Sequence, residues 1–129
     1  MAFRVEIQQQ ALADLDSIAD NIKARSSFAS AEKWFNGLLD DIASLKEIPE
    51  RCTVAPESED LDREVRVLLH GRRNRSYKIY FPVHHETAIS GIVSILHVRH
   101  WARRPVDADE LNDLMDDQLE DRNAADSCG

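Results

Sequence analysis

The sequence has 129 residues, of which 43% are hydrophobic and 31% charged, a balance that predicts one folded domain and excludes general disorder. No stretch approaches about 20 consecutive apolar residues, and the N-terminus lacks the basic and apolar regions of a secretory signal. The two cysteines, Cys52 and Cys128, form neither a disulfide framework nor a zinc-ligand spacing. We therefore expect a soluble cytoplasmic protein that does not associate with membranes.

The first half of the sequence predicts a strand followed by two helices. Residues 3–7 alternate apolar and polar side chains, as a half-buried strand does. From about residue 10, apolar residues recur every three or four positions, which predicts an amphipathic helix. After "ARSSFAS", where Ser27 or Ser30 can cap a helix, a second apolar stripe that includes Trp34 and Phe35 runs to residue 45. The short polar break between the helices predicts a helical hairpin.

The second half predicts three strands, "EVRVLL", "YKIYF" and "GIVSILHVRH", after a surface connection, "PERCTVAPESEDLD". The segments "HGRRNRS" and "PVHHET" have the length of hairpin joints. The order β-α-α-β-β-β predicts an α+β fold with a small antiparallel-rich sheet and the helical hairpin on one face. We place one domain in residues 1–105. Residues 106–129 follow it as a short acidic amphipathic helix with a frayed end.

The net charge of −8 is unevenly distributed. Residues 1–62 carry 13 acidic and 6 basic side chains, residues 63–105 carry 9 basic and 2 acidic ones, and residues 106–129 carry 9 acidic ones and a single arginine. A basic segment of +7 therefore lies between acidic segments of −7 and −8. Such asymmetry indicates more about binding partners than the total does.

Strand alternation divides the predicted sheet into an apolar and a cationic face. We expect these side chains to face the helices: Val65, Val67, Leu69, Tyr77, Ile79, Phe81, Leu96 and Val98. The opposite face then carries Arg66, Lys78, Tyr80, His97 and Arg99. Basic side chains of the adjoining loop and strand exit would line its rim: Arg72, Arg73, Arg75, His100, Arg103 and Arg104. This face is either a solvated surface or a binding face for a phosphodiester backbone.

A nuclease site would use the same face. RNA cleavage through the 2′-hydroxyl needs an acid, a base and cations around the phosphorane. His97 or His100 would serve as acid or base, because imidazole titrates near neutrality, unless they have structural roles. Tyr80 would orient the substrate or donate a proton, and the stabilising cations would be Lys78, Arg66 and Arg99. We expect no metal and no cofactor, because His84 and His85 lie in a predicted turn without cysteines nearby and no glycine-rich phosphate loop is present.

The order of elements, the run "GRRNRSYKIYF" and the ending "ILHVRHWARRP" resemble the RelE/ParE superfamily of toxins from bacterial type II toxin–antitoxin systems. Members often show an arginine-rich turn, a Tyr-Arg-Ile-x-Tyr-like strand and a last strand that ends in His-x-x-Arg. Here these motifs read Tyr77-Lys78-Ile79-Tyr80 and His100-Trp101-Ala102-Arg103. The first-helix pattern "ALADLDSI" is similar as well, and the ending resembles the plasmid-stabilisation proteins of this group.

The resemblance implies a cytoplasmic toxin that a cognate antitoxin neutralises in a hetero-oligomer. RelE-like members cleave mRNA on the ribosome, whereas ParE-like members poison DNA gyrase. Lys78 stands where RelE-like enzymes frequently carry arginine, and no tyrosine follows the last strand. The histidines and Lys78 favour a ribosome-dependent endoribonuclease, which is the first hypothesis. The missing tyrosine favours the second and third hypotheses, a non-enzymatic gyrase inhibitor and an inactive member.

The acidic segment 106–129 has three interpretations. It is a solvated helix, a terminal helix that packs beside the sheet where antitoxins can displace it, or an electrostatic mimic that covers the basic face. The last interpretation follows from the opposite charges of adjacent segments.

Overall fold

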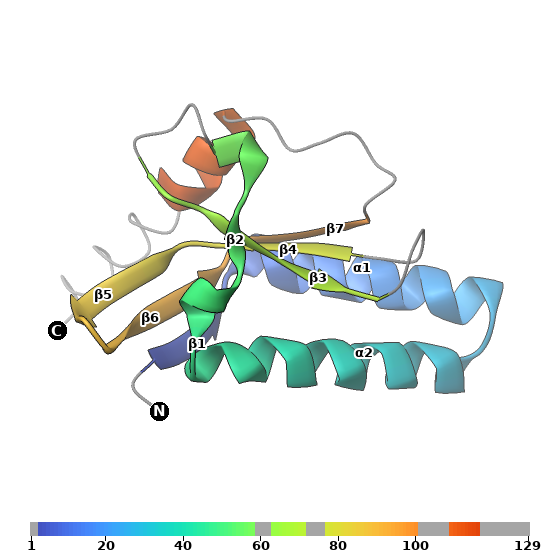
Figure 1. Ribbon diagram of the computed structural model, residues 1–129. Helices are drawn as coiled ribbons and strands as arrows, with labels where there is room; N and C mark the ends of the chain where they lie inside the picture. The colour runs from blue at the N-terminus through green and yellow to red at the C-terminus, as the bar shows by residue number, and fades with distance from the viewer. Residues whose placement is uncertain (1–2, 59–62, 72–76, 101–108, 117–129) are drawn as a thin grey trace, which may run out of the picture.

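The computed structural model describes residues 3–58, 63–71, 77–100 and 109–116 (Figure 1). Its elements are β1 (Phe3–Ile7), α1 (Gln9–Arg25), α2 (Phe28–Ala43), η1 (Ser44–Lys46), η2 (Pro49–Arg51), β2 (Thr53–Val54), η3 (Pro56–Ser58), β3 (Arg66–His70), β4 (Tyr77–Phe81), β5 (Val83–Thr87), β6 (Ser90–Ile95) and β7 (His97–His100). Residues 109–116 form a further short helix, called the C-terminal helix below. The predicted α+β class is confirmed. None of the described helices has the length and apolarity needed to cross a membrane.

The predicted helical hairpin is confirmed, and α1 and α2 lie side by side against one face of the sheet (Figure 1). Ser27 is the cap of α2, because its hydroxyl accepts a hydrogen bond from the backbone N–H of Ser30 at 3.0 Å. The apolar stripes explain the packing: α1 buries Ala11 and Leu15, and α2 buries the residues Ala31, Leu38 and Ile42.

The strands form two sheets of order β1-β6-β5 and β2-β3-β4-β7. The β1–β6 pair is parallel and the remaining pairs are antiparallel. Two predicted connections contain strands. "PVHHET" forms β5, so that the hairpin turn falls at residues 88–89, and the expected surface connection after residue 49 contains β2. Both were missed because these strands are largely exposed and lack apolar alternation.

The predicted last strand, residues 91–100, is interrupted and belongs to both sheets. Three residue steps separate Tyr80 from Val83, whereas four separate their partners His97 and Val93, so the β6–β7 side contains one extra residue. Pro82, which has no N–H to donate to a ladder, lies opposite this irregularity. A bulge of this kind changes which side chains face each side of the sheet.

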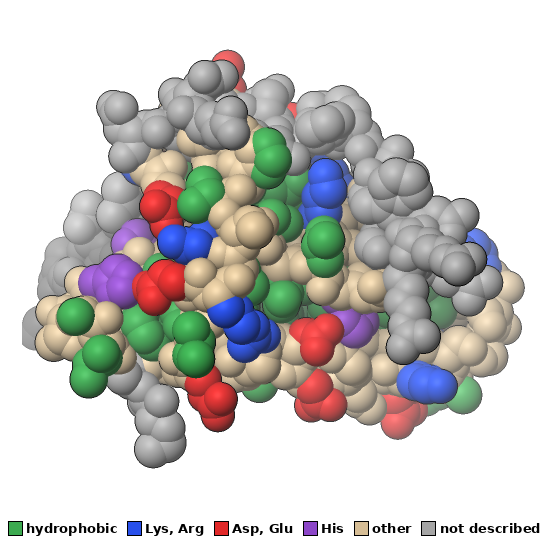
Figure 2. Space-filling model, in the orientation of Figure 1, with side chains coloured by type: hydrophobic (Ala, Val, Ile, Leu, Met, Phe, Trp, Pro, Cys, Tyr) green, Lys and Arg blue, Asp and Glu red, His purple; other side chains and the backbone are tan. Residues whose placement is uncertain are grey.

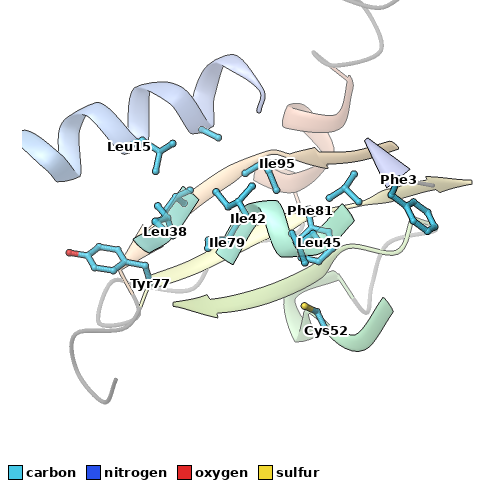
Figure 3. Close-up of a cluster of buried hydrophobic side chains, with 13 residues drawn as sticks. Phe3, Leu15, Leu38, Ile42, Leu45, Cys52, Tyr77, Ile79, Phe81 and Ile95 are labelled. Carbon is cyan, nitrogen blue, oxygen red and sulfur yellow. The ribbon is translucent and has the colours of Figure 1, made fainter. Parts of the chain in front are cut away.

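The apolar side chains form two cores. The main core lies between the helical hairpin and the sheets, and Figure 3 shows its side chains from both layers lying together: Phe3, Leu15, Leu38, Ile42, Leu45, Ile79, Phe81 and Ile95. The second core lies under the C-terminal helix and consists of Ala55, Val65, Tyr80, Leu96, Leu111 and Met115. Tyr77, Ile79, Phe81 and Val98 face the main core as predicted.

Four of the predicted main-core positions are wrong. Val65 and Leu96 are buried in the second core, Val67 packs against it, and the side chain of Leu69 is exposed. Leu68 packs against the main core instead, because it lies opposite Ile79 in the β3–β4 register. The alternation in β3 is therefore shifted by one residue from the prediction.

Cys52 provides a test of the main core. Burial raises the pKa of its thiol, although nearby Arg51 and Arg66 act in the opposite direction. In a Cys128→Ser chain, we expect a thiol reagent near pH 8 to modify Cys52 about tenfold more slowly in the native than in the urea-unfolded protein. The thiol of Cys52 loses its proton at a lower pH in the unfolded chain than in the folded protein. Raising the pH above the ordinary thiol pKa therefore favours the unfolded state, and the free energy of unfolding should decline. Equal modification rates would contradict this description.

Candidate functional site

Four of the predicted catalytic side chains lie on one side of the sheet. In the β4–β7 register Lys78 is opposite Arg99 and Tyr80 is opposite His97, and directly opposed residues of antiparallel strands project to the same side. The rings of Tyr80 and His97 are stacked, with centroids 6.4 Å apart and an interplanar angle of 25°. The alternation of the sequence predicted this grouping correctly.

The part of this side around Tyr80 is covered, which corrects the expectation of an open face. The C-terminal helix packs Leu111 and Met115 into the second core against Tyr80, whose exposed fraction is 0%. A plain solvated helix is therefore the wrong interpretation for residues 109–116. Tyr80 is an interior side chain in this structure and does not meet solvent.

A row of polar contacts joins α1, β7 and the C-terminal helix. Nδ1 of His97 lies 2.6 Å from Oδ2 of Asp14, although the direction between the two atoms does not satisfy a hydrogen bond. Nε of Arg99 donates to Nε2 of His97 at 3.2 Å, and Nη2 of Arg99 lies 3.0 Å from Glu110. Because Nε2 of His97 accepts, the arrangement requires the imidazole proton on Nδ1, toward Asp14. His97 and Arg99 are therefore engaged within the protein.

Arg66 was wrongly assigned to this side. It lies opposite Phe81 in the β3–β4 register and therefore projects toward the other face. Its guanidinium donates to the backbone carbonyl of Cys52 at 2.6 Å and pairs with Glu64 at 2.7 Å. These contacts hold the segment around β2 against β3.

His100 projects toward the helical hairpin. It lies opposite Tyr77, and the two rings meet edge to face with centroids 5.1 Å apart. Both residues line a groove of about 440 Å³ between α1 and β7, together with Asp14, Asn21, Arg25 and His97.

The sequence analysis missed the α1 side of this groove. Asp14 accepts hydrogen bonds from the backbone N–H of Val98 and from Nε2 of Gln10, both at 3.0 Å. The carboxylate thereby satisfies a backbone donor at the outer edge of β7. The sequence pattern around Asp14 indicates only an amphipathic helix, and it does not indicate a contact with a strand 84 residues away.

The remaining predicted binding residues, Arg72, Arg73, Arg75, Arg103 and Arg104, lie outside the described residues. On the face shown in Figure 2, acidic, basic and hydrophobic side chains of the described residues are interspersed. On β7 itself, Arg99 is accompanied by the carboxylate of Glu110.

Comparisons with known proteins agree with this architecture. A family model described as the ParE toxin of the type II toxin–antitoxin system parDE matches residues 5–103. A solved structure described as the chromosomal ParDE TA system from P. aeruginosa is similar, with a TM-score of 0.59 and 19% identity over 77% of this chain and 96% of that chain. No curated protein sequence matches significantly. The structural likeness supports the fold, and the family model covers both the groove and the covered face.

Proposed function

The chain belongs to the ParE toxin family of type II toxin–antitoxin systems, and we propose that it stops growth by binding DNA gyrase rather than by cleaving RNA. A cognate antitoxin would neutralise it in a cytoplasmic hetero-oligomer. The resemblance noted in the sequence supplies gyrase as the target of the ParE-like branch. The burial of Tyr80 and the contacts of His97 and Arg99 within the protein favour this branch over the RelE-like one.

The observation that carries the proposal is the internal engagement of the residues that RNA cleavage would need. An acid or base must reach the proton that it transfers, whereas Tyr80 is fully buried and the Nε2 atom of His97 accepts from Arg99. Arg99 in turn contacts Glu110, and Arg66 points to the other side of the sheet. Inhibition by binding needs none of these groups to be accessible.

Ribosome-dependent mRNA cleavage is the second candidate function, because the groove between α1 and β7 offers an alternative place for chemistry. His97 and His100 line it together with Arg25, so an acid, a base and a cation would all be available there. An inactive member of the family remains the third hypothesis.

A paired assay separates these functions. We expect the purified chain to block supercoiling by gyrase and to leave transcripts on translating ribosomes intact. Cleaved transcripts with normal supercoiling would support the nuclease, and no effect in either assay would support an inactive member.

His100→Gln provides a residue-level test, because the amide keeps polarity but cannot act as an acid or base near neutral pH. We expect inhibition of supercoiling by this variant to change less than about threefold, whereas loss of an acid or base should reduce cleavage by about 10²–10⁴-fold. Lys78→Ala should behave in the same way, because a binding inhibitor has no phosphorane charge to stabilise. Abolished toxicity in both folded variants would support the nuclease instead.

A further inference from the structure

The sheet side beneath the C-terminal helix has the composition of a single-stranded nucleic-acid platform. Lys78 and Arg99 are opposed cations, and the adjacent pair of Tyr80 and His97 is a stacked ring pair. Proteins that bind single strands combine cations that follow the phosphates with aromatic rings on which bases stack. All four side chains come from β4 and β7, which hold them in a fixed register.

The C-terminal helix occupies this side with acidic groups. Glu110 lies 3.0 Å from Nη2 of Arg99, and Asp116 lies 3.0 Å from Nη1 of Arg63. A carboxylate and a phosphate accept the same N–H donors of a guanidinium, so these contacts resemble those that a phosphate would make. Between them, Leu111 and Met115 are buried against the sheet. Figure 1 shows this helix on the side of the sheet away from α1 and α2.

The covering helix is short and weakly attached at its end. A helix of eight residues does not persist in isolation, so its order depends on docking. The Arg63–Asp116 pair is exposed, with 42% and 58% of the two side chains accessible, and such pairs contribute little. Undocking of the helix therefore costs less free energy than global unfolding, which must also separate the main core.

We propose that the C-terminal helix is an intramolecular acidic cover over a latent binding surface for single-stranded nucleic acid. In the closed state the carboxylates occupy the arginines and the apolar residues of the helix hide Tyr80. In the open state Lys78, Arg99 and the Tyr80–His97 ring pair bind the backbone and bases of a single strand. The proposal concerns binding alone and does not depend on gyrase as the target.

The test uses the full chain carrying Glu110→Gln and Asp116→Asn, which weaken the cover without shortening the protein. The probe is a labelled oligonucleotide of about 12 nucleotides, within the usual site size of such surfaces, and its binding is followed by fluorescence anisotropy. The two substitutions free Arg99 and Arg63 from their carboxylates, and each freed arginine can make about one phosphate contact. The plot of log K against log salt should then steepen by about 1.4 for a single strand, and the affinity at about 50 mM salt should rise about tenfold.

The matched control carries Asp109→Asn and Asp113→Asn. Both aspartates are exposed on the same helix, and their replacement changes the net charge by the same amount. We expect less than a twofold gain in affinity for this control. Adding Arg99→Gln to the Glu110→Gln, Asp116→Asn chain should remove about half of the added salt dependence, because only Arg63 then remains freed. An equal gain in affinity for the Glu110→Gln, Asp116→Asn chain and for the control would mean that net charge alone causes the effect, and it would overturn the proposal.

A second variant, Leu111→Asp, forces the helix from the sheet by placing a charge in the second core. Hydrogen exchange should show that the amides of residues 109–116 lose protection while those of β4 and β7 keep it. If such an open, folded chain binds no better than the unmodified chain, the latent surface does not exist. RNA and DNA probes of the same sequence identify which single strand is preferred. The assay contains no gyrase, so its outcome is independent of the supercoiling test.

Discussion

Replacing Gly91 with alanine is expected to lower the free energy of unfolding by about 3 kcal/mol, near the upper end for overpacking. A β-carbon at Gly91 would lie 2.0 Å from the carbonyl oxygen of His84 and 2.9 Å from Cα of His85, and both atoms belong to the backbone of β5. β6 lies between β1 and β5, with Gly91 opposite both Phe3 and His85. The strand therefore cannot move away from β5 without disturbing β1.

Gly37→Ala is the matched control for Gly91→Ala. A β-carbon at Gly37 would approach Cε1 of His70 to 3.5 Å, an ordinary contact, and the position is inside α2. Because alanine favours helix over glycine by about 1 kcal/mol, this variant should be neutral or stabilised. Urea unfolding of the two variants measures the difference. A Gly91→Ala chain within about 0.5 kcal/mol of the unmodified protein would contradict the described close approach.

Asp14→Ala is expected to destabilise the protein by about 1–3 kcal/mol, because it leaves the backbone N–H of Val98 without an acceptor. The substitution would also remove the carboxylate that lies 2.6 Å from Nδ1 of His97, whose side chain is only 12% exposed. The amide of Val98 should also exchange its hydrogen faster than in the unmodified protein, because the carboxylate at the edge of β7 is gone.

Two variants delimit the role of Asp14. Asp14→Asn retains an oxygen that can accept from Val98 but removes the charge beside His97, so an intermediate loss of stability is expected. Asp16→Ala removes an exposed carboxylate from the same helix and should change stability by less than about 0.5 kcal/mol. Equal stabilities of the Asp14→Ala and Asp16→Ala chains would show that the contact with β7 contributes nothing.

The sequence predicted those parts of the fold whose side chains have a single buried face. The stripe through Leu38 and Ile42 marked α2, and the alternation of Tyr77, Ile79 and Phe81 marked β4 correctly. β5 was missed because its side chains are partly or fully exposed and pairing with β6 alone defines it as a strand. The interruption between β6 and β7 at residue 96 was missed, because a bulge depends on pairing with the partner strand and not on local composition.

The candidate site was predictable only within one hairpin. Alternation placed Lys78 beside Arg99 and Tyr80 beside His97, because both pairs lie on adjacent strands. The alternation of the strands could not reveal that Leu111 packs over Tyr80. The charge and amphipathicity of residues 106–129 fit a solvated helix as well as a helix packed on the sheet. Nor could alternation connect Asp14 with Val98, which are 84 residues apart and meet only when α1 packs along the edge of β7.

The parallel pairing of β1 with β6 has a consequence for synthesis of the toxin. Residues 3–7 leave the ribosome long before residues 91–95, which are their partners. The buried side chains of α1 and α2 also rest on late residues such as Ile79, Ile95 and Val98. A nascent chain that ends before residue 90 lacks the central strand of the three-stranded sheet and cannot close the main core. We therefore expect translation that stops before residue 90 to yield an unfolded fragment instead of a partially active toxin, because the main core closes only after residues 91–98 have been made.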